Sequence, residues 1–399
     1  MPAKAAKFLD SNAGAPLRLE VVTALSCLFN SQDHLIANPS SVHLFGRKSK
    51  RWMAEAREQI AATFGKRTDP EQLIFTSSGT EANQLAVRSI LEPLLDSGAQ
   101  PHWITTPVEH DSVLQLVKWL EMRGGSVSYL PVDSNGRPDS KSISVLIRKE
   151  TALISMIWVN NETGVISDIK TAVESAHSSG IKIHIDAAQA WGKLLLDLNE
   201  TGADYVSFSG HKIGALAGTG VLWVGRGAQI KPIILGKQEK GRRGGTENLS
   251  GIVAMGAAAS ALRVEEWDLK VRPLRDYLES VICTRIHVVK INGVNAPRVS
   301  NTTNLSFDEV EGEGLVHALD LSGYAVSAGS ACSSGAIEPS HVLLAMKCSR
   351  KQAMASIRVS LGENIDRDDI DSFAITLSTI IERLRGAPKS HDAYLGALI

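Results

Sequence analysis

Residues 152–190, ALISMIWVNNETGVISDIKTAVESAHSSGIKIHIDAAQA, contain the clearest structural signal in the sequence. Residues 152–159 are apolar almost throughout, which is typical of a parallel strand covered on both faces. Residues 169–177 predict a helix, and residues 181–185 predict a second strand. A strand, a helix and a strand in this order form a βαβ unit, which indicates an α/β fold with a mostly parallel sheet.

The same texture extends to both sides of this stretch and changes after about residue 265. Before that point we predict strands at 72–76, 205–209 and 221–224, and a helix at 81–90. Beyond it we predict a helical stretch at 254–275, strands near 287–291 and 303–307, and helices near 314–319 and 368–384. We therefore expect two domains: a large one at 16–265, and a smaller α+β one formed by 1–15 and 266–399.

Composition narrows the class of protein. The chain has 399 residues, 43% of them hydrophobic and 21% charged, as in ordinary globular proteins. Its net charge of −1 provides no general basic field for nucleic acid or an anionic membrane. The start, MPAKAAKFLD, does not resemble a signal peptide, and no apolar run reaches the roughly 18–20 residues of a membrane span. We expect a cytoplasmic protein that binds neither nucleic acid nor membrane.

The four cysteines are scattered and form no CxxC pair or zinc-site spacing. A functional cysteine is therefore expected to be a nucleophile, and we expect no bound metal. Cys332 lies in SAGSACSSG (327–335), where small residues offer little to pack. We expect this segment to be mobile, as suits a sulfur carrier. For Cys27, Cys283 and Cys348 we expect buried hydrophobic positions.

Four polar segments follow predicted strands, and ligands of open α/β sheets bind outside the carboxyl ends of the strands. The segments are TSSGTE (76–81), VNNETG (159–164), HIDAAQ (184–189) and SFSGHK (207–212). We expect them to converge on one site. The first suits an anion at a helix N-terminus, or a capping box with Ser78 and Glu81. The second suits hydrogen bonds to a ligand or an ordinary turn.

The last two segments point to one cofactor. An Asp at the end of a buried strand needs a cation or donors, so Asp186 suits a pyridinium nitrogen or caps a helix. Lys212 follows a buried strand directly, and a lysine held in a pocket can act as an amine nucleophile. Asp186 after one strand, with Ser209, His211 and Lys212 after the next, is the pattern of a pyridoxal 5′-phosphate (PLP) site.

The sequence resembles the PLP-dependent cysteine desulfurases of the class V aminotransferase family, the type that supplies iron–sulfur cluster assembly and nitrogen fixation. The resemblance covers about residues 9–370. It rests on SSGTEANQLAV (77–87), VEHDSVL (108–114), VNNETGV (159–165), HIDAAQAWGK (184–193), SFSGHK (207–212), GRRGGTEN (241–248), SAGSACSS (327–334) and SIRVSLG (356–362). It implies the fold type I of PLP-dependent transferases, with a large parallel-sheet cofactor domain and a smaller α+β domain.

The resemblance also implies residue roles. Lys212 matches the lysine that binds PLP covalently, Asp186 the partner of the pyridinium nitrogen, and Gln189 the group that binds the phenolic oxygen. His110 matches the imidazole stacked on the ring and a proton shuttle. The implied phosphate ligands are Gly79, Thr80, Ser209, His211 and, from the neighbouring subunit of a homodimer, Thr246. Asn161 matches a residue that contacts cofactor and substrate, and Arg358 one that binds the carboxylate of the substrate.

Cys332 distinguishes a desulfurase from an aminotransferase. The implied reaction converts L-cysteine to L-alanine and leaves a persulfide on Cys332 for a sulfur-acceptor protein, such as an iron–sulfur scaffold. A transient iron–sulfur contact through Cys332 is compatible with this role. The alternatives are selenocysteine lyase, an ordinary class V aminotransferase, and a sulfur-relay or scaffold protein without catalysis.

Three departures from the family pattern affect loops rather than these residues. Residues 214–218 read GALAG, with Leu216 and Ala217, where the family usually has Gly-Pro-Lys-Gly. Lys237 interrupts a glycine cluster, and residues 11–15 read SNAGA instead of containing Asn-Ala-Thr-Thr. We expect these changes to affect loop shape, dimer contacts or rate.

Overall fold

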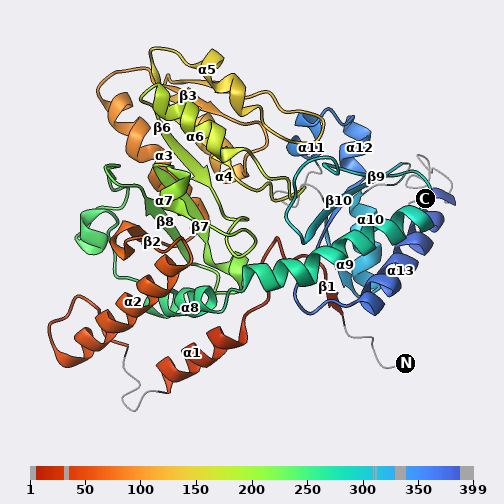
Figure 1. Cartoon of the computed structure of the whole chain (residues 1–399), viewed down its shortest axis with the longest axis horizontal. Coiled ribbons are helices and arrows are strands. Elements are labelled where there is room, and N and C mark those ends of the chain that lie inside the picture. Colours follow the sequence, from red (N-terminus) through yellow and green to blue (C-terminus); the bar gives the residue numbers. More distant parts are fainter. Residues whose placement is uncertain (1–5, 31–35, 309, 311, 329–337, 387–399) are drawn as a thin grey trace, which may run out of the picture.

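The computed structural model of the protein describes residues 6–30, 36–308, 310, 312–328 and 338–386 (Figure 1). Its larger sheet has seven strands in the order β2-β8-β7-β6-β5-β3-β4. The strands are β2 (Leu73–Thr76), β3 (His102–Thr105), β4 (Ser126–Tyr129), β5 (Thr151–Ile157), β6 (Lys182–Asp186), β7 (Tyr205–Ser209) and β8 (Gly220–Val224). Only β8 is antiparallel to its neighbours among these strands. The prediction of a mostly parallel sheet is confirmed.

Helices pack on both faces of this sheet (Figure 1). They include α3 (Gly79–Asp96), α4 (Asp111–Met122), α5 (Ile143–Leu146), α6 (Ile169–Ser178) and α7 (Leu198–Thr201). Helix α8 (Leu249–Ser260) contacts α1 (Leu19–Phe29) and α2 (Leu44–Ala62). None of the helices in the described ranges is long and apolar enough to cross a membrane.

Aromatic packing fixes the end of β7. The rings of Phe64 and Phe208 stack with centroids 4.3 Å apart, and Trp191 meets Phe208 at 5.5 Å. All three side chains are almost fully buried. Truncating a buried Phe to Ala typically costs about 3–5 kcal/mol. Because Phe208 directly precedes Ser209, this packing holds the loop that follows β7.

A second sheet has the strand order β12-β13-β10-β9 and is antiparallel. Its strands are β9 (Val289–Ile291), β10 (Thr302–Phe307), β12 (Ser327–Ala328) and β13 (Ser356–Ser360). Helices α9 (Val264–Arg285), α10 (Gly312–Leu321) and α13 (Arg367–Gly386) pack beside it, with α11 (His341–Ala345) and α12 (Arg350–Met354) nearby. The short strand β1 (Lys7–Phe8) pairs with β11 (Tyr324–Ala325), so the N-terminal segment joins the C-terminal part of the chain (Figure 1).

One predicted element is wrong in its extent. The helical stretch expected at 254–275 is divided between α8 and α9 by a break at residues 261–263. No Gly or Pro marks this break. It forms where Leu262 turns to pack against the core of the larger sheet. The two-domain division at residue 265 stays a prediction, although separate hydrophobic cores accompany the two sheets.

Candidate active site

The polar segments after β2, β5, β6 and β7 lie at one edge of the larger sheet, because these strands run in the same direction. The edge faces the N-terminal segment and the second sheet, and side chains from all of these parts contact one another. The contacts form an anion cradle and two hydrogen-bonded networks.

The cradle joins the N-terminus of α3 to the end of β7. A Cβ placed on Gly79 would lie 3.1 Å from the Cβ of Ser209, so only a residue without a side chain allows this close approach. Ser78 caps α3 by accepting a hydrogen bond from the Glu81 N–H at 3.1 Å, as the capping alternative expected. The first N–H groups of an 18-residue helix favour an anion at this place.

Ser209 and His211 form the other side of the cradle. The Ser209 hydroxyl and His211 Nδ1 are 2.9 Å apart. Burial, together with the positive charge of Lys212, lowers the pKa of His211 to about 4. The imidazole is therefore neutral at pH 7 and can serve as a hydrogen-bonding group rather than a charge. Thr80, in contrast, is exposed.

The first network connects Asp186 to His110. Asp186 is buried and accepts hydrogen bonds from the Ala188 N–H at 3.0 Å and from Asn83 Nδ2 at 2.8 Å. Asn83 Nδ2 also donates to the Ser112 hydroxyl at 2.9 Å, which lies 2.8 Å from His110 Nδ1. Turns rather than a helix follow Asp186, so the helix-cap alternative for this residue is wrong.

The buried carboxyl of Glu109 lies beneath this network. Its Oε1 accepts hydrogen bonds from the Thr106 hydroxyl at 2.7 Å and the Ile157 N–H at 2.9 Å. Its Oε2 is buried without a hydrogen-bond partner among the described residues. Burial, with a smaller effect of the Asp186 charge, raises the pKa of Glu109 to about 8. Glu109 is therefore mainly protonated at neutral pH.

We expect Glu109→Gln to reduce the pH dependence of stability. A carboxyl whose pKa rises from 4.5 to about 8 on folding contributes stability at low pH that is lost as pH rises through this interval. Thermal unfolding from about pH 5 to about pH 8 should show a smaller decline for Glu109→Gln than for the wild type. The exposed Glu265→Gln is the control. Parallel curves for wild type and Glu109→Gln would refute the prediction.

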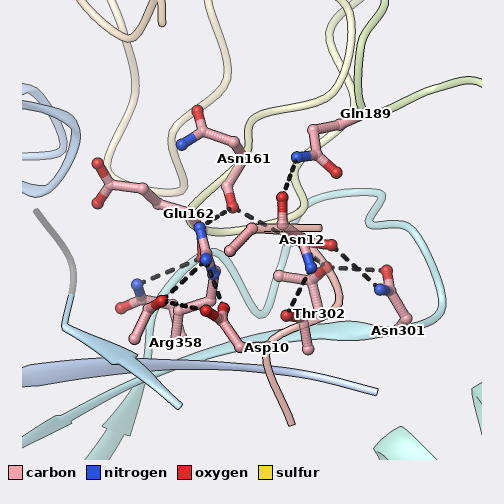
Figure 2. A network of polar contacts seen from close by, with 12 residues as sticks. Asp10, Asn12, Asn161, Glu162, Gln189, Asn301, Thr302 and Arg358 are labelled. Carbon is pink, nitrogen blue, oxygen red and sulfur yellow. Dashed lines mark hydrogen bonds and ion pairs between the residues drawn. The ribbon is translucent and has the colours of Figure 1, made fainter. Parts of the chain in front are cut away.

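The second network surrounds Asn12, which is almost fully buried (Figure 2). The Lys212 ammonium donates to the backbone oxygens of Asn12 at 2.7 Å and Ala13 at 3.0 Å. Gln189 Nε2 donates to the same Asn12 oxygen at 2.9 Å. Asn12 Nδ2 reaches the second sheet at the Thr302 hydroxyl, 2.9 Å away. The N-terminal segment thus links the loops after β6 and β7 to the second sheet.

Arg358, on β13, completes this network. Its guanidinium forms an ion pair with Asp10 at 2.6 Å and donates to the Ser327 hydroxyl at 3.0 Å and the Asn161 carbonyl at 3.1 Å (Figure 2). Its Nε is buried without a hydrogen-bond partner in the described part of the chain. The side-chain amide of Asn161 points away from these contacts, so its predicted ligand role is not visible in them.

Comparisons with known proteins follow this geometry. The family model of the class V aminotransferases matches residues 7–373. The chain belongs to this family. A cysteine desulfurase IscS from Dictyoglomus turgidum is 40% identical over 95% of both chains. The cysteine desulfurase NifS of Azotobacter vinelandii is 38% identical over 95% of this chain and 93% of the relative.

Solved structures agree. A NifS-like protein superposes with a TM-score of 0.86 at 29% identity, over 95% of this chain and 100% of the other. A structure described as SspA in complex with cysteine has a TM-score of 0.78 at 30% identity, over 89% of this chain and 98% of the other. The predicted resemblance to cysteine desulfurases and the predicted fold class of a PLP-dependent class V aminotransferase are confirmed.

Two predicted residues of this class V aminotransferase do not join the networks. Thr246 is exposed and lines a separate cavity of about 150 Å³ that also includes Thr76 and Ser77. Cys332 lies outside the described residues. The role predicted for each stays a prediction.

The other cysteines divide into two groups. Cys348 is buried, as predicted, but Cys27 on α1 and Cys283 on α9 are exposed, so the prediction is wrong for these two. Each lies on the outer side of a helix whose opposite side packs on the protein. Of the departures from the family pattern, Leu216 packs partly on the core, Ala217 is exposed, and Lys237 directly precedes a 3-10 turn at Gln238–Gly241.

Sequence reasoning missed several residues of the site. Asn83 is a single polar residue on the buried face of α3, next to Ala82 and Leu85, and that position could have identified it. Asp10 and Asn12 gave no such signal, because their partners lie hundreds of residues away along the chain.

Proposed function

We propose that the protein is a PLP-dependent cysteine desulfurase that converts L-cysteine to L-alanine and transfers the sulfur to Cys332. The observation that carries this proposal is the meeting of Lys212, Asp186 and the Gly79–Ser209 cradle at one sheet edge, connected through Asn12 to Arg358. The names of the relatives and the neighbour described as a complex with cysteine support the reaction.

The side chains at this edge fit the polar groups of PLP. The N-terminus of α3, with Ser209 and His211, suits the phosphate. Asp186, already accepting two hydrogen bonds, suits the pyridinium nitrogen. Gln189 would hold the phenolic oxygen, and His110 would lie over the ring. When bound, PLP supplies an electron sink for the carbon chemistry of the amino acid.

Further proposed ligands come from the same loops. Gly79 and Thr80 would donate N–H groups to the phosphate, and Asn161 would contact both cofactor and substrate.

Arg358 would bind the substrate carboxylate. A guanidinium presents donors in a planar fork that matches a carboxylate, and its Nε is still unsatisfied in the described residues. Asp10 and Ser327 hold the other side of the fork at 2.6 and 3.0 Å. This arrangement fixes the orientation of Arg358 before substrate arrives, which reduces the cost of ordering it.

Lys212 and Cys332 would carry out the proton and sulfur transfers. The Lys212 amine removes the Cα proton of the substrate, and His110 serves as a proton shuttle near its thiol. The Cys332 thiolate then attacks the substrate sulfur, so that an S–S bond forms and the Cβ–S bond breaks. The electron pair of the broken bond remains on the carbon fragment, which is protonated and released as alanine.

An assay with L-cysteine and a thiol reductant tests this function. We expect alanine and sulfide in equal amounts, because the reductant releases the sulfur from the enzyme. Selenocysteine as a parallel substrate separates the lyase alternative, which requires a strong preference for selenium. Cofactor-loaded protein that forms no alanine from cysteine would refute the proposal and favour the non-catalytic sulfur-relay alternative. We further propose a cytoplasmic location and delivery of sulfur to an acceptor protein such as an iron–sulfur scaffold.

We also propose a homodimer in which Thr246 serves the site of the partner subunit. Helix α1 supports this assembly, because apolar side chains of Leu19, Val22 and Phe29 are 76%, 43% and 50% exposed. Leu235, near the Thr246 loop, is 83% exposed. Exposed apolar surface of this kind marks interaction sites.

Subunit complementation tests the composite site. We expect Lys212→Ala and Thr246→Ala homodimers each to have reduced activity. Mixed dimers should regain activity, because one of their two sites then combines Lys212 of one subunit with Thr246 of the other. Random mixing should approach roughly a quarter of wild-type activity. An active monomer in sedimentation, or no gain over the two separate variants after subunit exchange, would contradict the assembly.

A further inference from the structure

A second lysine, Lys193, lies at the site in the turn that follows β6. Its side chain is 7% exposed. The ammonium donates to Asn12 Oδ1 at 2.7 Å and forms a short hydrogen bond with Gln189 Oε1. Burial, with the positive charges of Lys212 and Arg358, lowers the pKa of Lys193 well below the usual value for lysine.

The environment of Lys193 is unusual for a buried lysine. Its two hydrogen-bond acceptors in the described structure are uncharged amide oxygens, and the nearby charges named above are positive. Lys182, five positions from Asp186's loop partner Ala187, is half-exposed and pairs with the Asp204 carboxylate at 2.7 Å. Burying an amine without a counter-charge costs free energy, so the contacts of Lys193 must offset this cost or serve the site.

The two contacts determine how the neighbouring amides are oriented. A lysine ammonium only donates hydrogen bonds, so it selects the oxygen end of an amide. Gln189 therefore turns Oε1 to Lys193 and directs Nε2 toward the Asn12 carbonyl, which also holds the Lys212 amine. Asn12 likewise turns Oδ1 to Lys193 and directs Nδ2 toward Asn161 and Thr302.

We propose that Lys193 is a positioning residue that orients Gln189 and Asn12. Gln189 then presents an N–H to the phenolic oxygen of PLP, and Asn12 presents its carbonyl to the Lys212 amine. This inference rests on the proposed cofactor site. Lys193 itself reaches the cofactor only through these two residues.

Cofactor binding in the absence of cysteine tests the inference. We expect Lys193→Met to weaken PLP binding about tenfold or more and to shift the visible absorption band, because a hydrogen bond to a charged group is lost. The exposed Lys170→Met should bind PLP as the wild type does. In a Gln189→Ala background, Lys193→Met should cause little further loss, because its route to the cofactor is already removed. Unchanged binding, or a fully additive loss, would overturn the proposal.

A stability measurement on the cofactor-free protein provides a second test. Gln189→Glu would place a carboxylate against Lys193, so the melting temperature should be kept or raised. The same substitution in Lys193→Met should be strongly destabilising, because the carboxylate is then buried and unpaired. Equal effects in both backgrounds would show that the contact does not exist. A wild-type protein that still forms alanine from cysteine would leave the proposed function intact in that case.

Discussion

The Lys212→Ala variant is expected to lose covalently bound cofactor and nearly all desulfurase activity. In the wild type the amine lies at the end of β7, held by the Asn12 and Ala13 carbonyls. Alanine offers neither an amine for covalent bonding nor a base for the Cα proton, so turnover should fall by about 10³-fold or more. Borohydride reduction followed by mass spectrometry should find the cofactor attached at residue 212 of the wild type and absent from the variant.

Two controls make this prediction specific. Lys170→Ala changes an exposed lysine on α6 and should keep the attached cofactor. Lys193 offers a second amine near the site, but its ammonium is engaged by Asn12 and Gln189. Cofactor that remains covalently attached to Lys212→Ala at Lys193 would assign the two lysines in the wrong order.

The Cys332→Ser variant is expected to keep PLP and to bind L-cysteine, but to form no persulfide and almost no alanine. Lys212, Asp186 and Arg358 handle amine, electrons and carboxylate, and the substitution leaves them unchanged. Sulfur transfer requires a thiolate, and a serine hydroxyl is a far poorer nucleophile at neutral pH. The measurements are the cofactor spectrum after adding cysteine and the amount of alanine released.

Two comparisons accompany Cys332→Ser. Cys27→Ser removes an exposed thiol on α1 and should leave activity unchanged, which shows that an accessible thiol alone is not sufficient. Selenocysteine should still give some alanine with Cys332→Ser, because selenium leaves with less help. Turnover of L-cysteine at the wild-type rate by Cys332→Ser would transfer support to the lyase or aminotransferase alternative.

The sequence predicted the strands that carry the site better than the strands at the sheet edge. β5 and β7 are almost entirely apolar, so their pattern was clear. β3 and β4 were missed because they are four residues long and contain polar side chains. His102 is buried in β3 only because Thr151 and Ser128 satisfy both ring nitrogens at 2.8 and 2.9 Å, which no local pattern reveals.

The same limit applies to the site. Lys212, Asp186 and Ser209 could be predicted because each follows a recognisable strand. The partners that orient them could not, because Asp10 meets Arg358 across 348 positions and Asn12 meets Lys212 across 200. Exposure of Cys27 was missed because α1 is apolar on most sides, which locally resembles a buried helix.

The central claim is that sulfur passes from cysteine to Cys332. Its most direct test is to incubate the cofactor-loaded protein with L-cysteine without reductant, alkylate it, and identify the modified peptides by mass spectrometry while alanine is measured. The account predicts one additional sulfur on Cys332, in proportion to the alanine formed. Alanine formation with unmodified Cys332, or with the added sulfur on Cys27 or Cys283 instead, would contradict it.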